Sequence, residues 1–178
     1  MGKRSTFKRA KGDRYLTPWA PVADLARHLP ARFRFAEPCA ADGRLIDHLR
    51  RLGGSCVEAL DLNPGRGDVR QGDALRWAPR SYLFRKLDFI ITNPPWTRVL
   101  LHQMIRNFSW FAPTWLLFDA DWLHTIQAVP FLRHLVKVVS VGRVKWIEGS
   151  KHTGKDNCAW YLFDARHTGG TEFIGRAA

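Results

Sequence analysis

Apolar and polar residues alternate along this chain with two different periods. Alternation every second residue, or a short apolar run, predicts a β-strand, whereas a period near 3.6 predicts an amphipathic helix. The expected strands cover residues 32–36, 56–60, a segment that runs up to Asn93, and 115–118. The expected helices cover residues 15–29, 45–52 and 100–108. Because helices separate the strands, the pattern predicts a single-domain α/β fold, with a Rossmann-like, doubly wound and mostly parallel sheet.

The last third of the chain carries weaker patterns. We expect a mostly helical segment at 121–135, and strands at 136–147, 158–163 and 171–174. In the first of these strands Arg143 and Lys145 alternate with Val144 and Trp146, so one face would be basic and the other apolar. A polar loop follows, and its cationic side chains are Lys151, His152 and Lys155. These side chains fit either a mobile substrate-binding loop or ordinary solvated charges.

Four polar side chains stand where predicted strands or turns end: Glu37, Asp61, Asp73 and Asn93. In doubly wound sheets, ligands bind beyond the carboxyl ends of the strands, near the switch in strand order. Each acid by itself is typical of a solvated surface carboxylate. Their shared position at one edge of the sheet is what predicts a binding site.

The net charge of the chain indicates what kind of partner it binds. The 178-residue chain has 28 Lys and Arg against 16 Asp and Glu, a net charge of +12. Such an imbalance favours a polyanionic partner, most simply nucleic acid. A basic protein of the membrane surface is the alternative, but no lysine-rich amphipathic helix is evident.

Domain organisation and location follow from composition. Residues 1–14 are basic and polar, and we expect a flexible arm there, either without a role or in contact with nucleic acid. Residues 15–178 are expected to form one domain, with no apolar run long enough to span a membrane and no secretory signal. The cysteines Cys39, Cys56 and Cys158 contain no Cys-x-x-Cys pair, which argues against a zinc site and a disulfide framework. A cytoplasmic location without a metal is therefore expected.

The stretch Asn93-Pro94-Pro95-Trp96 carries the most specific chemistry. Two prolines end the buried strand, and Asn93 is biased to an extended backbone because it precedes a proline. A side-chain carbonyl, a backbone carbonyl and an aromatic ring together suit a planar group that bears an amine. A surface turn explains Asn93 and Pro94, but it requires neither the second proline nor Trp96.

The acids suggest a second ligand. A carboxylate after the second strand, Asp61, suits the two hydroxyls of a ribose, because it can accept two hydrogen bonds. Asp73 in the next turn suits an adenine amine, and Glu37 suits a cationic ammonium. The ligand implied is an adenosine that carries an amino acid; no phosphate-binding Gly-x-x-x-x-Gly-Lys loop is present.

These residues resemble the motif series of class I S-adenosylmethionine-dependent methyltransferases. The motifs are Glu37-Pro38-Cys39-Ala40-Ala41-Asp42-Gly43, Asp61, Asp73 and Asn93-Pro94-Pro95-Trp96. The last resembles the DNA adenine-N6 methyltransferases, including small phage-type orphan enzymes, and Tyr15-Leu16-Thr17-Pro18 is similar to their Thr-Pro segment. The likeness is clear over residues 15–96 and weak over 156–161.

The resemblance implies a role for each residue. S-adenosylmethionine would be bound by Tyr15, Thr17, Pro18, Glu37, Cys39, Ala40, Gly43, Asp61, Asp73 and Ala74. The target adenine, flipped out of the duplex, would be bound by Asn93, Pro94, Pro95 and Trp96. The basic strand and loop would contact nucleic acid through Arg143, Lys145, Lys151, His152 and Lys155. One departure is Ala41, which stands where the family usually has glycine.

The activity that the resemblance implies is methylation of adenine N6 in DNA, with double-stranded DNA as the partner. Methylation of an adenine or guanine amine in RNA is the first alternative, and a non-catalytic nucleic-acid-binding module is the second. Protein glutamine methylation also uses such a corner, but it does not call for so basic a chain. Neither the interval from Asp73 to Asn93 nor the segment after Phe163 is long enough for a separate target-recognition domain. We therefore expect loops, the arm, a second subunit or a partner protein to read the target.

Overall fold

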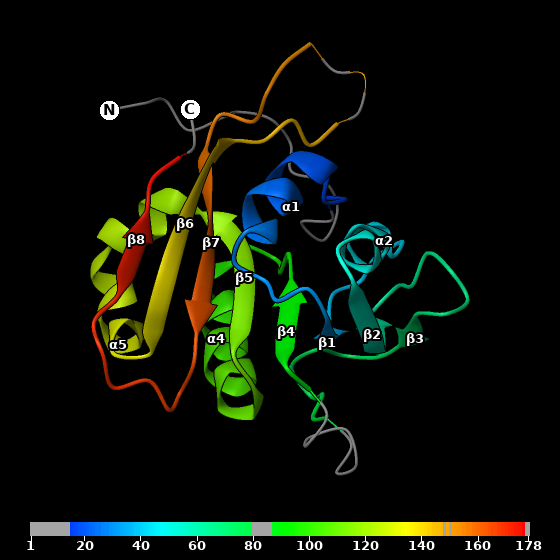
Figure 1. The fold of residues 1–178 in the computed structure, drawn as a ribbon, viewed down its shortest axis with the longest axis horizontal. Coiled ribbons are helices and arrows are strands. Elements are labelled where there is room, and N and C mark those ends of the chain that lie inside the picture. Colours follow the sequence, from blue (N-terminus) through cyan, green and yellow to red (C-terminus); the bar gives the residue numbers. More distant parts are fainter. Residues whose placement is uncertain (1–14, 80–86, 148, 150, 177–178) are drawn as a thin grey trace.

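The computed structural model describes residues 15–79, 87–147, 149 and 151–176 (Figure 1). The arm expected over residues 1–14 lies outside the described residues. One sheet of eight strands, in the order β3-β2-β1-β4-β5-β7-β6-β8, forms the centre. The strands are β1 (Phe33–Glu37), β2 (Gly54–Asp61), β3 (Arg70–Gln71), β4 (Phe89–Thr92), β5 (Thr114–Asp119), β6 (Leu135–Arg143), β7 (Asn157–Phe163) and β8 (Glu172–Ile174).

The sheet is mostly parallel, as predicted. Neighbouring strands from β3 to β5 run parallel, and β6 runs parallel to β8. Only β7 is reversed, because it pairs antiparallel with both β5 and β6. Since β1 lies beside both β2 and β4, the chain leaves β1 in one direction and later returns to its other side. That switch in strand order lies at the carboxyl ends of β1 and β4, where α/β folds bind ligands.

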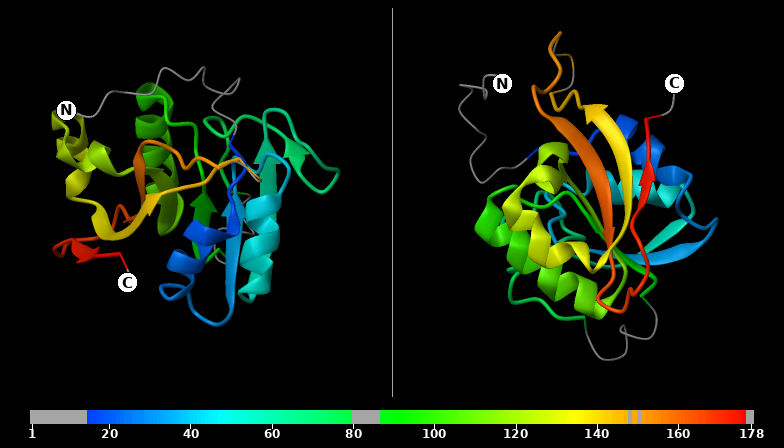
Figure 2. Two further views of the ribbon diagram at one scale, coloured as in Figure 1. Left: turned by 90° about the horizontal axis from the view of Figure 1, so that it is seen from above. Right: turned by 90° about the vertical axis from the view of Figure 1, so that its left-hand side faces the viewer.

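Helices cover both faces of the sheet (Figures 1 and 2). The helical segments are α1 (Trp19–Ala26), α2 (Arg44–Arg51), α4 (Arg98–Phe111), α5 (Val129–Leu132) and the 3₁₀ turns η2 (Ala120–His124) and η3 (Ile126–Ala128). Alternate residues of each strand face opposite sides, so Leu116 and Phe118 join the core beneath α4, whereas Trp115 and Leu117 join the core beneath α1 and α2. Burial on both faces explains why the central strands are continuous apolar runs.

Three details differ from the sequence expectations. The segment at 121–135 is mostly helical, as predicted, but it consists of two 3₁₀ turns and a one-turn helix, since Thr125 is extended and breaks the run. The strand predicted over 136–147 ends at Arg143, because the Val144 carbonyl bonds the loop amide of Gly154 at 2.7 Å instead of continuing the ladder. Strand β3 was not predicted, since it is only two exposed polar residues long.

Within the described part of the chain, the helices are too short or too polar to cross a membrane.

Candidate functional site

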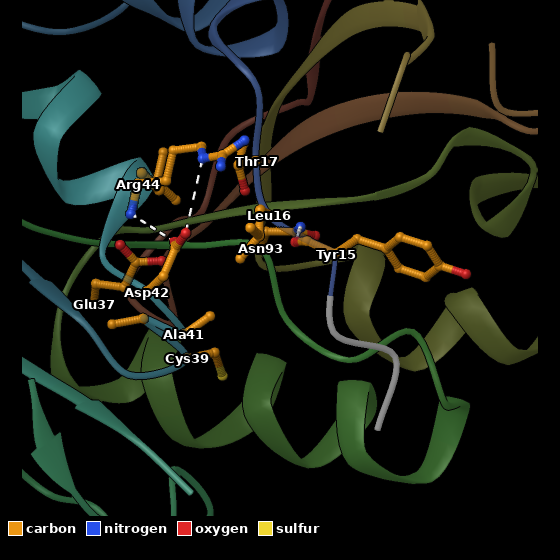
Figure 3. Close-up of a pocket in the computed structure, with 11 residues that line it drawn as sticks. Tyr15, Leu16, Thr17, Glu37, Cys39, Ala41, Asp42, Arg44 and Asn93 are labelled. Carbon is orange, nitrogen blue, oxygen red and sulfur yellow. Dashed lines mark hydrogen bonds and ion pairs between the residues drawn. The ribbon is translucent and has the colours of Figure 1, made fainter. Parts of the chain in front are cut away.

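The carboxyl ends of β1 and β4 border a pocket, shown in Figure 3. Of the residues predicted to bind a cofactor or target, it is lined by Tyr15, Thr17, Glu37, Cys39, Ala40 and Asn93. Its lining is completed by Leu16, Ala41, Asp42, Arg44 and Leu45. Residues from 15 to 93 in the sequence therefore converge at one edge of the sheet, and of the four polar residues at strand ends, Glu37 and Asn93 line this pocket.

Glu37 ends β1 with only 1% of its surface exposed. Its Oε1 accepts a weak hydrogen bond from the Thr92 hydroxyl at 3.5 Å, whereas its Oε2 has no hydrogen-bond partner among the described residues. Burial, and then the nearby Asp61 carboxylate, hold the pKa of Glu37 well above its ordinary value. A buried carboxyl group with an unused oxygen is completed by a proton or by a bound cation.

Asp61 ends β2, and its carboxylate holds the loop that follows β1. Its Oδ2 accepts from the Ala41 amide at 2.8 Å, and its Oδ1 accepts from the Asn63 amide at 2.8 Å. Each oxygen keeps a second lone pair, so Asp61 retains the capacity to accept from two hydroxyls. The conformation of Ala41 makes this arrangement possible: its φ is +50°, in the left-handed region that favours glycine. Alanine therefore keeps the glycine-like loop here, at a cost in backbone strain.

Residues 63–68, which we call the β2 strap, close over the same loop. The Gly65 amide donates to the Ala41 carbonyl at 2.7 Å. The guanidinium of Arg66 lies against Gly43, where even a Cβ atom would come within 2.5 Å of it. Arg66 is held there by Asp47 at 2.8 Å and by Asp68. These contacts explain why Gly43, with φ of +78°, has no side chain.

Five predicted cofactor residues do not line the pocket: Pro18, Gly43, Asp61, Asp73 and Ala74. Pro18 is the N-cap of α1, and Gly43 is the N-cap of α2. Asp73 follows β3 and accepts from the Leu75 amide at 2.9 Å, with 38% of its side chain exposed. It lies beyond the carboxyl end of β3, next in line after Glu37 and Asp61 along the edge.

Asn93 follows β4 with its amide fixed in orientation. Its Nδ2 donates to the backbone carbonyl of Tyr15 at 3.0 Å, so its Oδ1 is the acceptor that remains. The Trp96 indole N–H reaches this Oδ1 at 3.4 Å and the Leu117 carbonyl at 3.2 Å. Pro94 is buried and Pro95 half-buried, which makes the corner rigid. Only neutral donors and acceptors hold the amide.

Trp146 joins this corner and was not singled out from the sequence. Its ring meets Trp96 edge-on at a centroid distance of 5.8 Å and lies 5.9 Å from the ring of Tyr15. Three aromatic side chains from widely separated segments thus surround the Asn93 corner. The only sequence signal was the alternation of Trp146 with Lys145, and that pattern indicated a buried face rather than a site.

Two polar pocket residues, Asp42 and Arg44, were also missed as functional candidates. They pair at 3.8 Å and lie at the start of α2, beside Thr17 (Figure 3). The pocket therefore offers acids from Glu37 and Asp42 and a cation from Arg44. Burial raises the pKa of the Cys39 thiol far above its ordinary value, so Cys39 lines the pocket as a neutral group.

The basic residues predicted to bind nucleic acid lie at the same edge of the sheet. Because β7 runs antiparallel to β5, with Cys158 opposite Asp119, the loop between β6 and β7 projects beyond the carboxyl end of β5 (Figure 1). Arg143 and Lys145 are exposed, and so are the loop residues Lys151, His152 and Lys155. The structure brings these cations to the edge that holds Asn93, but they do not line its pocket.

No protein-family model matches the chain, and neither does any curated protein sequence. Solved structures do match. A candidate RNA methyltransferase from Pyrococcus horikoshii superimposes with a TM-score of 0.59 at 14% identity, over 89% of this chain and 90% of that one. A candidate class I S-adenosylmethionine-dependent methyltransferase from Listeria monocytogenes gives 0.56 at 9% identity, over 88% and 64%.

The modification subunit of a candidate type I restriction enzyme from Vibrio vulnificus gives a TM-score of 0.55 at 14% identity, over 93% of this chain and 47% of that one. The chain has the class I methyltransferase fold. This confirms the fold class predicted from the sequence. The chain thus spans less than half of the modification subunit but nearly all of the Pyrococcus protein, and the methyltransferase fold is what the three share with it.

Proposed function

We propose that this chain transfers a methyl group from S-adenosylmethionine to the exocyclic N6 amine of adenine in DNA. One observation carries the proposal: a buried, incompletely bonded Glu37 and an oriented Asn93 amide oxygen line one pocket of a methyltransferase fold. The first suits a cationic amino acid and the second suits a planar amine. The net charge of +12 favours a nucleic acid as the carrier of that amine.

The pocket fits the cofactor on chemical grounds. The unused oxygen of Glu37 suits the ammonium of the methionine moiety, and Arg44 with Thr17 suits its carboxylate. The spare lone pairs of Asp61 suit the ribose hydroxyls, and Asp73 with Ala74 suits the adenine. Pro18, Cys39, Ala40 and Gly43 shape the walls and the turn. When bound, S-adenosylmethionine supplies an electrophilic methyl group on a sulfonium.

The corner acts on the target amine by accepting its hydrogens. The N6 lone pair of adenine is delocalised into the ring, which makes the amine a poor nucleophile. Hydrogen bonds from its two N–H groups to Asn93 Oδ1 and to the Pro94 carbonyl favour a more tetrahedral nitrogen. The bond between Asn93 and Tyr15 holds the acceptor in place before the base arrives, and such preorganisation lowers the barrier.

The aromatic side chains would hold the flipped base. Trp96 is fixed by its indole hydrogen bonds, and Trp146 stands edge-on to it. Stacking on such a ring stabilises a bound base by about 1–3 kcal/mol, which offsets part of the cost of unstacking it. The exposed cations of the loop between β6 and β7 would contact the phosphates, from the same edge of the sheet.

The decisive experiment uses the full chain with methyl-labelled S-adenosylmethionine. Unmethylated duplex DNA and structured RNA are supplied separately and then in competition, and the products are digested to nucleosides. The proposal predicts that digestion of the DNA gives labelled N6-methyl-2′-deoxyadenosine. Label only in RNA nucleosides would replace DNA by RNA as the substrate. Cofactor binding without label in either polymer would favour a non-catalytic binding module.

Several finer points belong to the same proposal. The chain would act as one catalytic domain over residues 15–178, with target reading supplied by the arm at 1–14, by loops, by a second copy or by a partner protein. Restriction-footprint or long-read sequencing of DNA from cells that express the chain identifies the target. Methyladenine in a single sequence context indicates that the chain methylates a specific target sequence. Methyladenine in all sequence contexts indicates that it methylates adenine without sequence specificity.

A further inference from the structure

A second groove lies away from the pocket, between α4 and the segment that includes α5. It has a volume of about 350 Å³. Its lining residues are Arg98, Val99, His102, Arg106, Gln127, Pro130 and Phe131. Figure 2 shows the two segments side by side on one face of the sheet. None of the lining residues is an acid, and none belongs to the pocket at Glu37 and Asn93.

The groove starts next to the corner that would hold the target base. Helix α4 begins two residues after Trp96, and its first residue, Arg98, is fixed by Asp119 at 3.1 Å. His102 and Arg106 follow at one-turn intervals on the same side of the helix. At 1.5 Å per residue, Arg98 and Arg106 are about 12 Å apart along the axis. A stacked strand of nucleic acid rises about 3.4 Å per nucleotide, so this length matches three to four nucleotides.

The side chains in the groove present hydrogen-bond donors. Trp122 donates to His102 Nε2 at 3.0 Å, which places the proton of the neutral imidazole on Nδ1. The Arg106 guanidinium lies over the ring of Phe131 at 5.6 Å, and no carboxylate partner for it is seen in the described part of the chain. Gln127 adds an exposed amide. Arg98 is paired with Asp119, but no acid is among the groove-lining residues, and the donors of His102, Arg106 and Gln127 suit a chain of phosphates.

Apolar side chains complete the surface. Val99 is 68% exposed, and Pro130 is exposed opposite it. A groove with cations along it and apolar walls suits a single strand, whose sugars and bases need contacts that a duplex keeps inside. The high net charge opposes a second copy of this chain as the occupant.

Resting on the proposed function, we infer that the groove between α4 and α5 binds the strand that flanks the target base, as single-stranded nucleic acid. The Arg98–His102–Arg106 stripe would contact its phosphates. This site is additional to the loop between β6 and β7: its residues come from α4 and from the segment of η3 and α5, and none comes from that loop.

The test measures binding by fluorescence anisotropy without any methyl donor. The probe is a fluorescein-labelled single-stranded DNA of about 15 nucleotides, which covers a typical binding site. Arg106→Gln should weaken binding about fivefold at 0.1 M salt and lower the slope of log K against log salt by about 0.7, the loss expected for one phosphate contact. Gln127→Glu should also weaken binding, whereas Gln127→Lys should strengthen it.

Arg32→Gln is the matched control. Arg32 is exposed just before β1, at the opposite edge of the sheet, so the same loss of charge there should leave affinity and slope nearly unchanged. The inference fails if the three groove variants bind the strand like the parent chain. If Ile126→Asp, beside the groove, then changes self-association, the surface is a protein interface instead. With methyl donor present, Arg106→Gln should raise KM for nucleic acid and leave kcat unchanged.

The two proposals fail separately. Absence of methyl transfer with an altered affinity in the groove variants would overturn the proposed activity and keep the strand site. Methyl transfer by the parent chain, together with groove variants that bind the strand normally, would keep the proposed activity and overturn the strand site.

Discussion

The two halves of the site differ in charge and in how they are held. On the Glu37 side, loops from β1 and β2 meet, and carboxylates of Glu37, Asp42 and Asp61 lie close together. On the Asn93 side, the groups are an amide, prolines and indoles, and they are fixed by neutral hydrogen bonds. An acidic half and a neutral half therefore meet at this pocket, whose lining includes Glu37, Asp42 and Asn93, and the prolines and indoles stand beside it.

In the proposed function, this difference in charge directs the cationic methyl donor to one half of the site and the target base to the other, which the net charge alone would not do. A net charge of +12 repels small cations at long range, and it attracts polyanions. In the proposed function, Asp42, Asp61 and the ionised form of Glu37 would attract a cationic donor locally. In the proposed function, the neutral half would accept an uncharged base from a charged polymer. The two halves are not independent if a substitution in one half alters the binding of the ligand in the other half.

The largest effect is expected from Asn93→Ala. Removing a preoriented polar group from a reaction centre lowers kcat by about a hundredfold or more. Cofactor affinity, measured by calorimetry, should stay nearly the same, since the contacts at Glu37 and Asp61 are untouched. Asn107→Ala is a matched control, because Asn107 is exposed on α4 and its amide bonds only the Leu75 carbonyl at 3.4 Å. Activity that survives in Asn93→Ala would remove Asn93 from the chemistry.

The next effect is expected from Glu37→Gln. A hydrogen bond to a charged group contributes about 1.5–3 kcal/mol, so the affinity for S-adenosylmethionine should fall about tenfold to a hundredfold. Target binding without cofactor should not change. The free protein should become more stable at neutral pH, because the variant removes a carboxyl group whose ionisation is disfavoured by burial.

Glu37 also predicts a pH dependence with a definite sign. Its pKa is raised in the folded chain, so its contribution to stability is present below about pH 4.5, its ordinary value, and is lost as the pH rises towards the folded pKa. A bound ammonium favours the carboxylate, so cofactor binding releases a proton, and affinity rises with pH up to that folded pKa. Calorimetry in buffers of different ionisation enthalpy measures the release. Equal heats in all buffers would contradict it.

The smallest effect is expected from Ala41→Gly. Left-handed backbone costs a non-glycine residue about 1 kcal/mol, and glycine relieves it while gaining entropy in the unfolded chain. The free energy of unfolding should therefore rise by less than about 1 kcal/mol. Ala40→Gly serves as the comparison, since no positive φ is recorded there and it should only destabilise. A loss of stability in Ala41→Gly would show that the strain at Ala41 is offset by its methyl group.

The sequence predicted the edge of the sheet better than the periphery. Apolar runs at 89–92 and 114–119 are buried on both faces, so their pattern is unambiguous, and the polar residues that end them could be placed. The two-residue strand β3 and the 3₁₀ turns have no apolar period of their own, because they depend on contacts made elsewhere.

Within the site, the single residues at strand ends were predictable and the residues that support them were not. The bond from Asn93 to the Tyr15 carbonyl spans 78 positions, and no local pattern encodes it. Trp146 reaches the corner only because the chain returns through β6, and its alternation with Lys145 is equally typical of a core residue. The strap at Arg66 depends on two acids from different segments.

A hydrogen bond outside the pocket ties helix α1 to strand β7. The Trp160 indole in β7 donates to the Pro21 carbonyl in α1 at 2.7 Å, across 139 positions. Helix α1 carries the preceding segment with Tyr15 and Thr17, which completes the pocket. The wall of the pocket that Tyr15 and Thr17 supply therefore depends on a strand near the other end of the described chain, and a change at Trp160 should loosen that wall without touching a pocket residue.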